Sequence, residues 1–317
     1  MNRRAAEAFW TVLSAVDPGL RAETSVARLR EDGRLLEDAV GLATANGLSF
    51  PFLRRLREWD VRLPARAEDR WRQDSESAIR VRDTLERLND ASRATGISYT
   101  VIKNCMTVDH VPRDLDVFIP SGEREGFLAA LGSQGLRLAY HDEAEISLQG
   151  PGLLKVDVYS RIHYLGRDFL RPEYLLGSRT TASAHGATHP TLLSEAAFLL
   201  NSAHGLFGHG AMSLLDFMDL TRLRQRISDP AAVRAEAASL GWGRVLDRWL
   251  GRLQEMERRV YGDRVPMRFP VRHGTRFVLG SVAALDGAHL GPRDFMALRA
   301  SLWWDDLVFL SEVAGLD

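Results

Sequence analysis

Two aspartates separated by one residue, Asp114 and Asp116, stand where a polar loop becomes an apolar run, in the segment RDLDVFIP (113–120). Alternate side chains of a β-strand lie on the same face, so a strand here would hold both carboxylates side by side. A third aspartate, Asp157, lies in a later strand-like run, GLLKVDVYS (152–160). If the two strands are neighbours, the three carboxylates converge and need cations, and all-oxygen clusters favour Mg²⁺ or Mn²⁺. The three aspartates are therefore our candidate catalytic and metal-binding residues.

Two lysines lie close to these aspartates in the sequence. Of the 41 lysines and arginines in the chain, only Lys103 and Lys155 are lysines. Lysine is a compact point charge whereas arginine is a planar fork, so these lysines can mark positions that arginine does not suit. Lys155 precedes Asp157 by two residues and would share its strand face. Because Mg²⁺ commonly shares its coordination sphere with substrate phosphates, we expect both lysines to bind phosphate.

The same residues also have plainer interpretations. Asp114 and Asp116 could form an exposed pair at a strand-entry turn, although the apolar residues that follow them argue against full exposure. Asp157 could be one half of an ion pair with Lys155 or with an arginine. The positions of the two lysines could be a coincidence in an arginine-rich chain.

The composition excludes several classes of protein. The chain has 317 residues, with 45% hydrophobic and 26% charged residues, as in ordinary soluble globular proteins. Its net charge of −1 provides no general attraction to nucleic acid or anionic membranes. The single cysteine allows no internal disulfide, the N-terminus lacks a signal-peptide pattern, and the longest uncharged window is too polar to cross a membrane. We therefore predict a cytoplasmic protein with no membrane partner.

The hydrophobic pattern predicts helices, then short strands, then helices again. Apolar residues recur at helical spacing through about the first 95 residues and again from about residue 166. Between them, β-branched and aromatic residues form five short strand-like runs that enclose one further helix. The connections are too short for a regular βαβ array, which indicates an α+β fold with a small mixed or antiparallel sheet. The predicted strands are 97–103, 115–120, 136–141, 144–150 and 152–160, and the predicted helices are 5–16, 24–47, 50–59, 65–96, 121–135, 188–209, 212–227, 229–262 and 291–315.

The order of these features resembles the uncharacterised nucleotidyltransferases of the DNA polymerase β-type superfamily. The similarity extends over roughly residues 40–225. The motifs that carry it are a Pro-Phe-Leu segment with arginines, FPFLRRL (50–56); a strand ending in VIKN (101–104), where the family has Leu-Lys-Gly; the Asp-x-Asp motif in RDLDVFI (113–119); Asp157 in KVDVY; and, in the C-terminal part, SAHGLFGH followed by LLDFMDL (214–220). Each motif is weak alone, and their common order is moderately specific.

The resemblance implies a fold in three parts. A nucleotidyltransferase-like catalytic core over residues 75–165, containing the small sheet, would lie between two helical regions. These are an N-terminal helical region over residues 1–74 and a C-terminal helical domain over residues 166–317.

The resemblance also implies a reaction. The enzyme would move a nucleoside monophosphate from an NTP, such as ATP, to an acceptor hydroxyl and release pyrophosphate. Asp114 and Asp116 would bind two Mg²⁺ or Mn²⁺ ions, and Asp157 would bind one of them and help to deprotonate the acceptor. We expect a small hydroxylated acceptor, with a tRNA end or a protein side chain as alternatives. The residues expected to bind the nucleotide are Lys103, Asn104, Arg113 and Lys155.

Two departures from the family pattern keep other functions open. The Gly-Ser pair that cradles triphosphate in the superfamily is absent, and Asn104 stands where the closer family has a glycine. Arg113 directly precedes the first aspartate, so its usual spacing is not kept. One alternative is therefore a catalytically degenerate binding module with this fold. A second is a glycosyltransferase that holds a nucleotide-sugar through Mn²⁺ and an Asp-x-Asp motif, although the helical N-terminal region argues against it.

Four polar residues of the C-terminal part receive plainer interpretations. His204 and His209 are five residues apart, which is not the spacing of a helical metal-binding pair, so we expect helix-end or core histidines. We expect Asp216 and Asp219 to face solvent or to pair with arginines of neighbouring helices.

Overall fold

The computed structural model describes residues 1–17, 19–20, 23–103, 107–141, 145–164, 167–208, 211–269 and 271–272. Its helices are α1 (Arg3–Val16), α2 (Glu23–Glu31), α3 (Gly33–Ala45), α4 (Ser49–Glu58), α5 (Ala65–Thr95), α6 (Arg124–Ser133), α7 (Pro172–Gly177), α8 (Ser194–Ala203), α9 (Leu214–Arg226), α10 (Pro230–Ser239) and α11 (Gly243–Glu257). Its strands are β1 (Thr100–Val101), β2 (Asp114–Phe118), β3 (Arg137–His141), β4 (Glu145–Gln149), β5 (Lys155–Tyr159), β6 (Ile162–Tyr164), β7 (Arg167–Leu170), β8 (Arg179–Ala184), β9 (Ala187–Leu192), β10 (Ala211–Met212) and β11 (Val271–Arg272).

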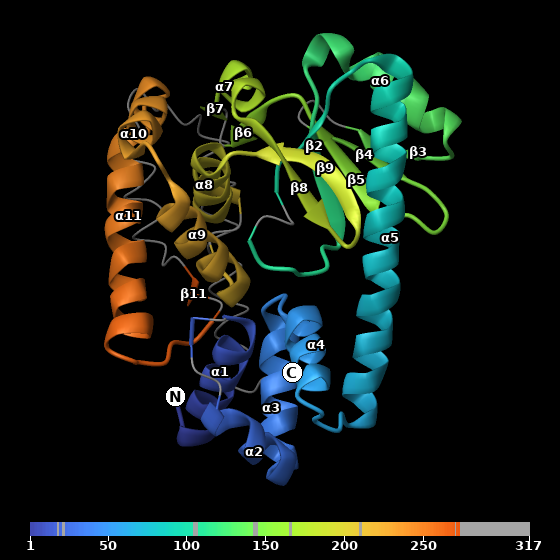
Figure 1. Cartoon of the computed structure of the whole chain (residues 1–317). Coiled ribbons are helices and arrows are strands. Elements are labelled where there is room, and N and C mark those ends of the chain that lie inside the picture. The colour runs from blue at the N-terminus through green and yellow to red at the C-terminus, as the bar shows by residue number, and fades with distance from the viewer. Residues whose placement is uncertain are drawn as a thin grey trace, which may run out of the picture.

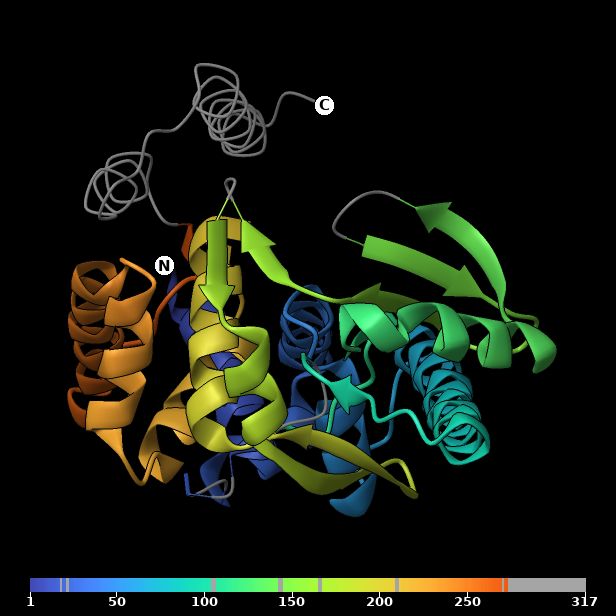
Figure 2. The ribbon, with the colours of Figure 1, turned by 90° about the horizontal axis from the view of Figure 1, so that it is seen from above.

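Seven of these strands form one mixed sheet, in the order β3-β4-β5-β2-β1-β9-β8. β2 pairs with β5 and β1 pairs with β9 in parallel, and the other neighbouring strands are antiparallel. α5 runs along one side of the molecule and α8–α11 gather on the opposite side, with the sheet between them (Figures 1 and 2). The predicted α+β fold with a mixed sheet and flanking helices is therefore confirmed.

The two faces of the sheet contribute to different hydrophobic cores. Leu115 and Val117 of β2 share a core with Leu85 of α5 and Phe127 of α6. Phe118, the neighbouring residue, belongs instead to the core formed by the C-terminal and N-terminal helices. Because successive side chains of a strand point to opposite faces, Asp114 and Asp116 also point away from α5 and α6.

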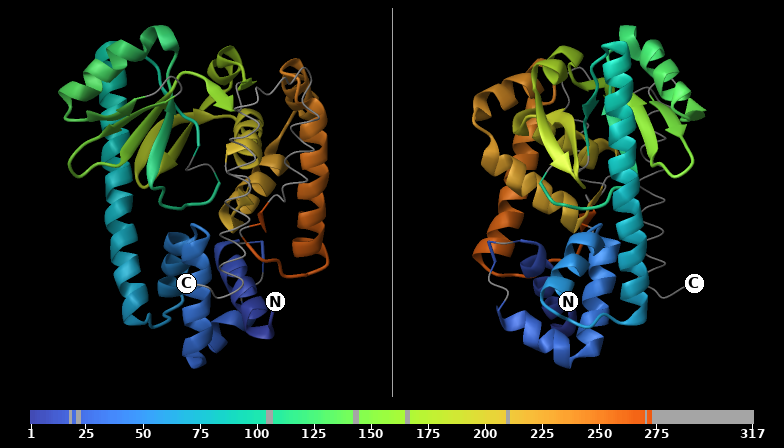
Figure 3. Two further views of the ribbon diagram at one scale, coloured as in Figure 1. Left: turned by 180° about the vertical axis from the view of Figure 1, so that it is seen from behind. Right: turned by 45° about the vertical axis from the view of Figure 1, so that its right-hand side comes forward.

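The N-terminal helices α1–α4 lie together at one end of the molecule (Figure 3). Their buried residues, such as Phe9 and Leu53, join Phe198 of α8 and Trp249 of α11 in one continuous core. The predicted division at residues 74 and 165 stays a prediction. Within the described ranges, no helix combines the length and the apolar character needed to cross a membrane.

The sequence predicts helices alone after residue 166, but the structure contains strands β7, β8 and β9 there. In particular, the predicted helix over 188–209 begins only at Ser194, because residues 187–192 pair with β8 and β1. His185 and Gly186 have φ of 50° and 90° and form the tight turn between β8 and β9.

Smaller differences concern the ends of elements. The predicted strand over 97–103 is reduced to two residues in β1. The predicted helix over 24–47 is interrupted at Asp32, whose side chain caps α3. The helix predicted over 229–262 is split into α10 and α11. The helix predicted over 291–315 lies outside the described residues.

Candidate active site

The register of β2 and β5 brings the charged residues of the sheet together. Asp114 lies opposite Lys155, and Asp116 lies opposite Asp157, in this parallel pair. Strand β4 runs antiparallel beside β5 and places Ser147 opposite Asp157. Opposed residues and alternate residues share a face, so these side chains all lie on the face turned away from α5 and α6. The structure thus gathers the three predicted aspartates and one of the two predicted lysines on adjacent strands.

The two lysines neutralise much of the charge of the three aspartates. Lys103, which follows β1, donates a hydrogen bond to Asp116 over 2.9 Å. Lys155 Nζ lies 2.7 Å from Asp157 and 3.6 Å from Asp114. Each aspartate is therefore within ion-pair distance of an ammonium group, which explains how like charges can stand side by side on one face.

The electrostatic balance is least favourable at Asp114. Asp116 and Asp157 are buried, whereas 36% of the Asp114 side chain is exposed. Burial raises the pKa of Asp114, and the charges of Asp116 and Asp157 raise it further, against the opposing effect of the lysines. Burial by itself would lower the pKa of Lys155, but its hydrogen bond to Asp157 and the nearby carboxylates raise that pKa above its ordinary value. The site therefore carries an excess of negative charge that favours cations.

A second group of residues, which the sequence analysis missed, supports Asp157 and Lys103. The Ser147 hydroxyl donates to Asp157 Oδ1 over 2.5 Å and lies 3.1 Å from Glu145. The Tyr159 hydroxyl donates to Glu145 over 2.7 Å, and Lys103 Nζ lies 4.7 Å from the centre of the Tyr159 ring. Both oxygens of Asp157 thus have donors, one from Ser147 and one from Lys155. The strands were predicted, but their register, which makes these residues neighbours, was not.

Helix α9 holds the loop that lies between Lys103 and Asp114. Asp219 accepts a hydrogen bond from the Thr107 hydroxyl, and Arg222 donates to the Thr107 carbonyl over 2.8 Å. The expectation that Asp219 faces solvent is wrong, because it is buried and its carboxylate accepts from Thr107. This burial raises the pKa of Asp219, while His110 and the Thr107 hydroxyl oppose the rise. The sequence signal that could have indicated this role is the position of Asp219 in LLDFMDL (214–220), one of the motifs of the family resemblance.

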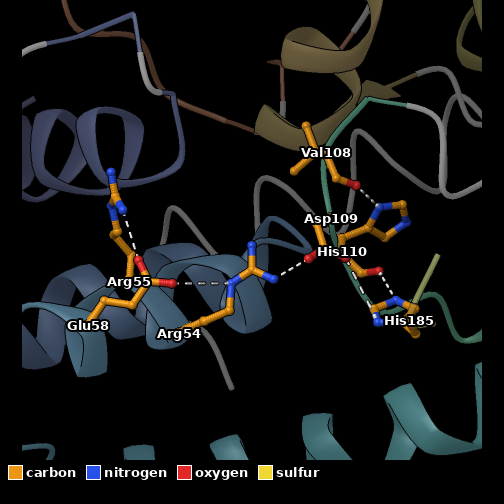
Figure 4. A network of polar contacts seen from close by, with 7 residues as sticks. All are labelled: Arg54, Arg55, Glu58, Val108, Asp109, His110 and His185. Carbon is orange, nitrogen blue, oxygen red and sulfur yellow. Dashed lines mark hydrogen bonds and ion pairs between the residues drawn. The ribbon is translucent and has the colours of Figure 1, made fainter. Parts of the chain in front are cut away.

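The same loop is also held by the N-terminal helices and by the β8–β9 turn. Arg54 of α4 donates to Asp109, and His185 Nε2 lies 2.9 Å from the His110 carbonyl oxygen (Figure 4). The His185 ring also meets the Phe50 ring edge to face, at 5.5 Å between ring centres. Elements far apart in the sequence therefore fix the chain segment that leads into β2.

A cavity of about 240 Å³ lies beside the aspartates, between the sheet and the C-terminal helices. Its lining includes Lys103, Asp114 and Asp116 on the sheet side and His204, Asp219 and Trp249 on the helical side. Asp216 also lines the cavity, although its side chain caps α9 in a capping box with Ser213. His204, interpreted from the sequence as a helix-end or core residue, follows α8 directly and is half-buried. His209 lies outside the described residues.

Arg113 and Asn104 are the other two predicted nucleotide-binding residues. Arg113 is exposed, and within the described part of the chain its side chain forms no ion pair. Asn104 lies outside the described residues. Lys103 and Lys155 are therefore the predicted nucleotide-binding residues that the structure places beside the carboxylates.

The carboxylates of Asp114, Asp116 and Asp157 are suitable ligands for a hard divalent cation, although the ammonium groups of both lysines lie within ion-pair distance of them. Among the residues that the structure describes, no three His, Cys, Asp or Glu side chains are arranged to hold a metal ion directly. Yet three carboxylates share one face, and the raised pKa of Asp114 reflects in part their mutual repulsion. Oxygen donors of this kind are those that Mg²⁺ and Mn²⁺ prefer. The chemistry of these donors suits such an ion, provided that Lys155 moves away from Asp114 and Asp157.

Comparison with known proteins identifies a family. A family model described as an uncharacterised nucleotidyltransferase matches residues 35–256. No curated protein matches the chain. Among solved structures, the chain is similar to the crystal structure of the lincosamide antibiotic adenylyltransferase LnuA with lincomycin bound, with 15% identity and a TM-score of 0.32 over 46% of this chain and 97% of that one.

Proposed function

The chain belongs to the family of uncharacterised nucleotidyltransferases, and from this premise we propose that it transfers a nucleoside monophosphate from an NTP to an acceptor hydroxyl. The observation that supports an active enzyme is the register of β2 and β5, which puts Asp116 opposite Asp157 and Asp114 opposite Lys155. A degenerate binding module would have no need of three carboxylates and two ammonium groups within ion-pair distance of one another.

The proposed roles follow from the charges. Mg²⁺ or Mn²⁺ held by Asp114, Asp116 and Asp157 would neutralise phosphate charge and lower the pKa of the acceptor hydroxyl. Lys103 and Lys155 would bind the phosphates as compact point charges.

In the proposed reaction, the acceptor oxygen attacks the α-phosphorus of the NTP. A bond forms between this oxygen and phosphorus, the bond from phosphorus to the α,β-bridging oxygen breaks, and pyrophosphate leaves. Asp157 takes the acceptor proton, for which one of its oxygens must be released by Ser147 or Lys155. Positioning and charge neutralisation supply most of the rate enhancement.

The cavity beside the aspartates is the proposed acceptor site. Its volume of about 240 Å³ suits a small molecule, and Trp249 and Asp219 offer an apolar surface and a hydrogen-bond acceptor. Its excess of carboxylates disfavours a polyanion such as a tRNA end. We propose a small hydroxylated acceptor in the cytoplasm, the compartment that the single cysteine favours.

The test is an acceptor screen with NTPs labelled at the α-phosphate, in Mg²⁺ and in Mn²⁺, with sugars, amino sugars, hydroxylated antibiotics, tRNA and protein. The proposal predicts label in an acceptor with an equal amount of pyrophosphate, and a loss of at least about 10²-fold in Asp116→Asn. Asp168→Asn is the matched control, because Asp168 pairs with Arg161 outside the site. Absence of transfer, together with absence of NTP binding, would contradict an enzyme and favour the degenerate binding module.

A further inference from the structure

The lysines of the site hold the carboxylates that a metal ion would use. Lys155 Nζ lies between two of them, 2.7 Å from Asp157 and 3.6 Å from Asp114. Lys103 pairs with the third, Asp116. A divalent cation and these ammonium groups would therefore compete for the same oxygens.

The two lysines differ in their freedom to move. The Lys103 side chain is only 12% exposed and lies against the Tyr159 ring, so its ammonium group has little room. The Lys155 side chain is 41% exposed, and its ammonium group can swing outward from the sheet face. Asp157 would keep its place when Lys155 leaves, because Ser147 holds its other oxygen. Lys155 is thus the movable counter-ion of the pair.

We propose that Lys155 is an internal counter-ion that blocks metal binding until the triphosphate of the NTP draws it away, so that metal and nucleotide enter the site together. The inference rests on the proposed function, since it concerns the same site. The phosphates supply a new partner for the ammonium group, and the freed carboxylates supply ligands for the metal. Such coupling is reciprocal: nucleotide raises the affinity for metal by the same factor as metal raises the affinity for nucleotide.

The experiment measures binding of Mn²⁺ alone, from the electron paramagnetic resonance signal of the free ion, to the wild type and to Lys155→Met. The proposal predicts that the variant binds Mn²⁺ at least about tenfold more tightly than the wild type, a modest allosteric factor. It also predicts that Lys155→Arg, which keeps the charge, binds Mn²⁺ as weakly as the wild type. Arg161→Gln is the control for net charge, because it removes one cation just beyond β5 from an ion pair with Asp168.

Two further measurements test where the Mn²⁺ ion binds and whether Lys155 binds phosphate. In Lys155→Met combined with Asp116→Asn, the gained Mn²⁺ binding should disappear, which locates the ion at the aspartates. Binding of ATP in the presence of EDTA should weaken at least about tenfold in Lys155→Met, because the phosphates lose a cation. Equal Mn²⁺ affinity of the wild type and Lys155→Met, including no binding by either, would overturn the inference. Because the Mn²⁺ measurement needs no nucleotide, that outcome is distinct from a failure of the wild type to bind NTP, which would instead contradict the proposed function.

Discussion

At the level of single residues, the site brings three carboxylates and two ammonium groups together on one face of the sheet. Asp116 and Asp157 each have an ammonium group within 3 Å, whereas the nearest lysine nitrogen to Asp114 is 3.6 Å away. Burial and the charges of Asp116 and Asp157 raise the pKa of Asp114, so its ionised form lowers the stability of the folded chain.

Replacing Asp114 by asparagine should stabilise the metal-free protein. The folded-state pKa of Asp114 lies above its ordinary value of 3.8, so the ionised group lowers the free energy of unfolding as pH rises through the folded pKa. With EDTA at pH 7.5, we expect the melting temperature of Asp114→Asn to rise by about 2 °C, a small effect because the group is partly solvated. The difference should shrink below pH 4, where both proteins are neutral at this position. A lower melting temperature for the variant at pH 7.5 would contradict this account of the charge balance.

His189 of β9 should make the fold sensitive to acid. Burial lowers the pKa of His189, and the neighbouring His185 lowers it further. Because the folded pKa lies below the unfolded value of 6.5, stability is lost as pH falls below 6.5, by at most about 1.4 kcal/mol per pH unit. Chemical denaturation at pH 8.0 and 5.5 should show a smaller loss in His189→Leu than in the wild type. The same loss in both proteins would assign the acid sensitivity to other groups.

At the scale of elements, α9 is the support of the candidate active site. Its residues Asp219 and Arg222 bind the side chain and the carbonyl of Thr107, and Arg222 also donates to the Val16 carbonyl over 3.2 Å. One helix therefore connects α1 with the loop that lies between Lys103 and Asp114. Displacement of that loop would move Lys103, the proposed phosphate-binding residue, relative to the three aspartates.

Arg222→Met should therefore lower catalytic efficiency without any direct contact with substrate. We expect kcat/KM for the NTP to fall by about 10-fold to 100-fold, mostly through KM, because Lys103 loses its alignment. Arg226→Met is the control, since Arg226 lies one turn further along α9 and is exposed. Steady-state kinetics of both variants, with melting temperatures to verify folding, would test this. Equal kinetic parameters for the two variants would show that the loop does not depend on α9.

Parts of this arrangement could be read from the sequence, and others could not. The three aspartates, the two lysines and the α+β class follow from charge spacing and hydrophobic period, which are local properties. The pairing of Asp116 with Asp157 depends on a parallel neighbour 41 residues away, reached through α6, β3 and β4, and no local pattern encodes such a register.

The strands and site residues that the sequence did not predict also depend on contacts between distant segments. Strands β8 and β9 consist largely of threonine, alanine and serine, whose weak alternation was outweighed by the helical pattern that follows. The local sequence does not distinguish Asp219 from an exposed aspartate on a helix surface. It is buried because the loop that contains Thr107 packs against α9. Ser147 carries no signal until β4 lies beside β5.

At the scale of the whole molecule, one hydrophobic core connects the two helical parts of the chain. Phe9 of α1, Phe217 of α9 and Trp249 of α11 belong to the same cluster, which also includes Phe118 of the sheet. The candidate site lies between the sheet and the C-terminal helices, which belong to this core. The geometry of the site therefore depends on the N-terminal helices as well as on the C-terminal ones.

The whole molecule should accordingly unfold in one step. Phe9→Ala removes a buried ring far from the site and should cost about 3–5 kcal/mol. Differential scanning calorimetry should give a single transition for the wild type and a single transition at lower temperature for the variant. Two transitions, of which only one moves in Phe9→Ala, would instead support the independent N-terminal region predicted over residues 1–74.

The most direct test of the central claim is metal-dependent binding of NTP at the aspartates. Melting temperatures would be measured with each NTP, with and without Mg²⁺ or Mn²⁺, for the wild type, Asp116→Asn and the control Asp168→Asn. The account predicts a rise that needs both NTP and metal, persists in Asp168→Asn and disappears in Asp116→Asn, because a ligand stabilises the state that binds it. No rise with any NTP at millimolar concentration, or the same rise in Asp116→Asn as in the wild type, would contradict it.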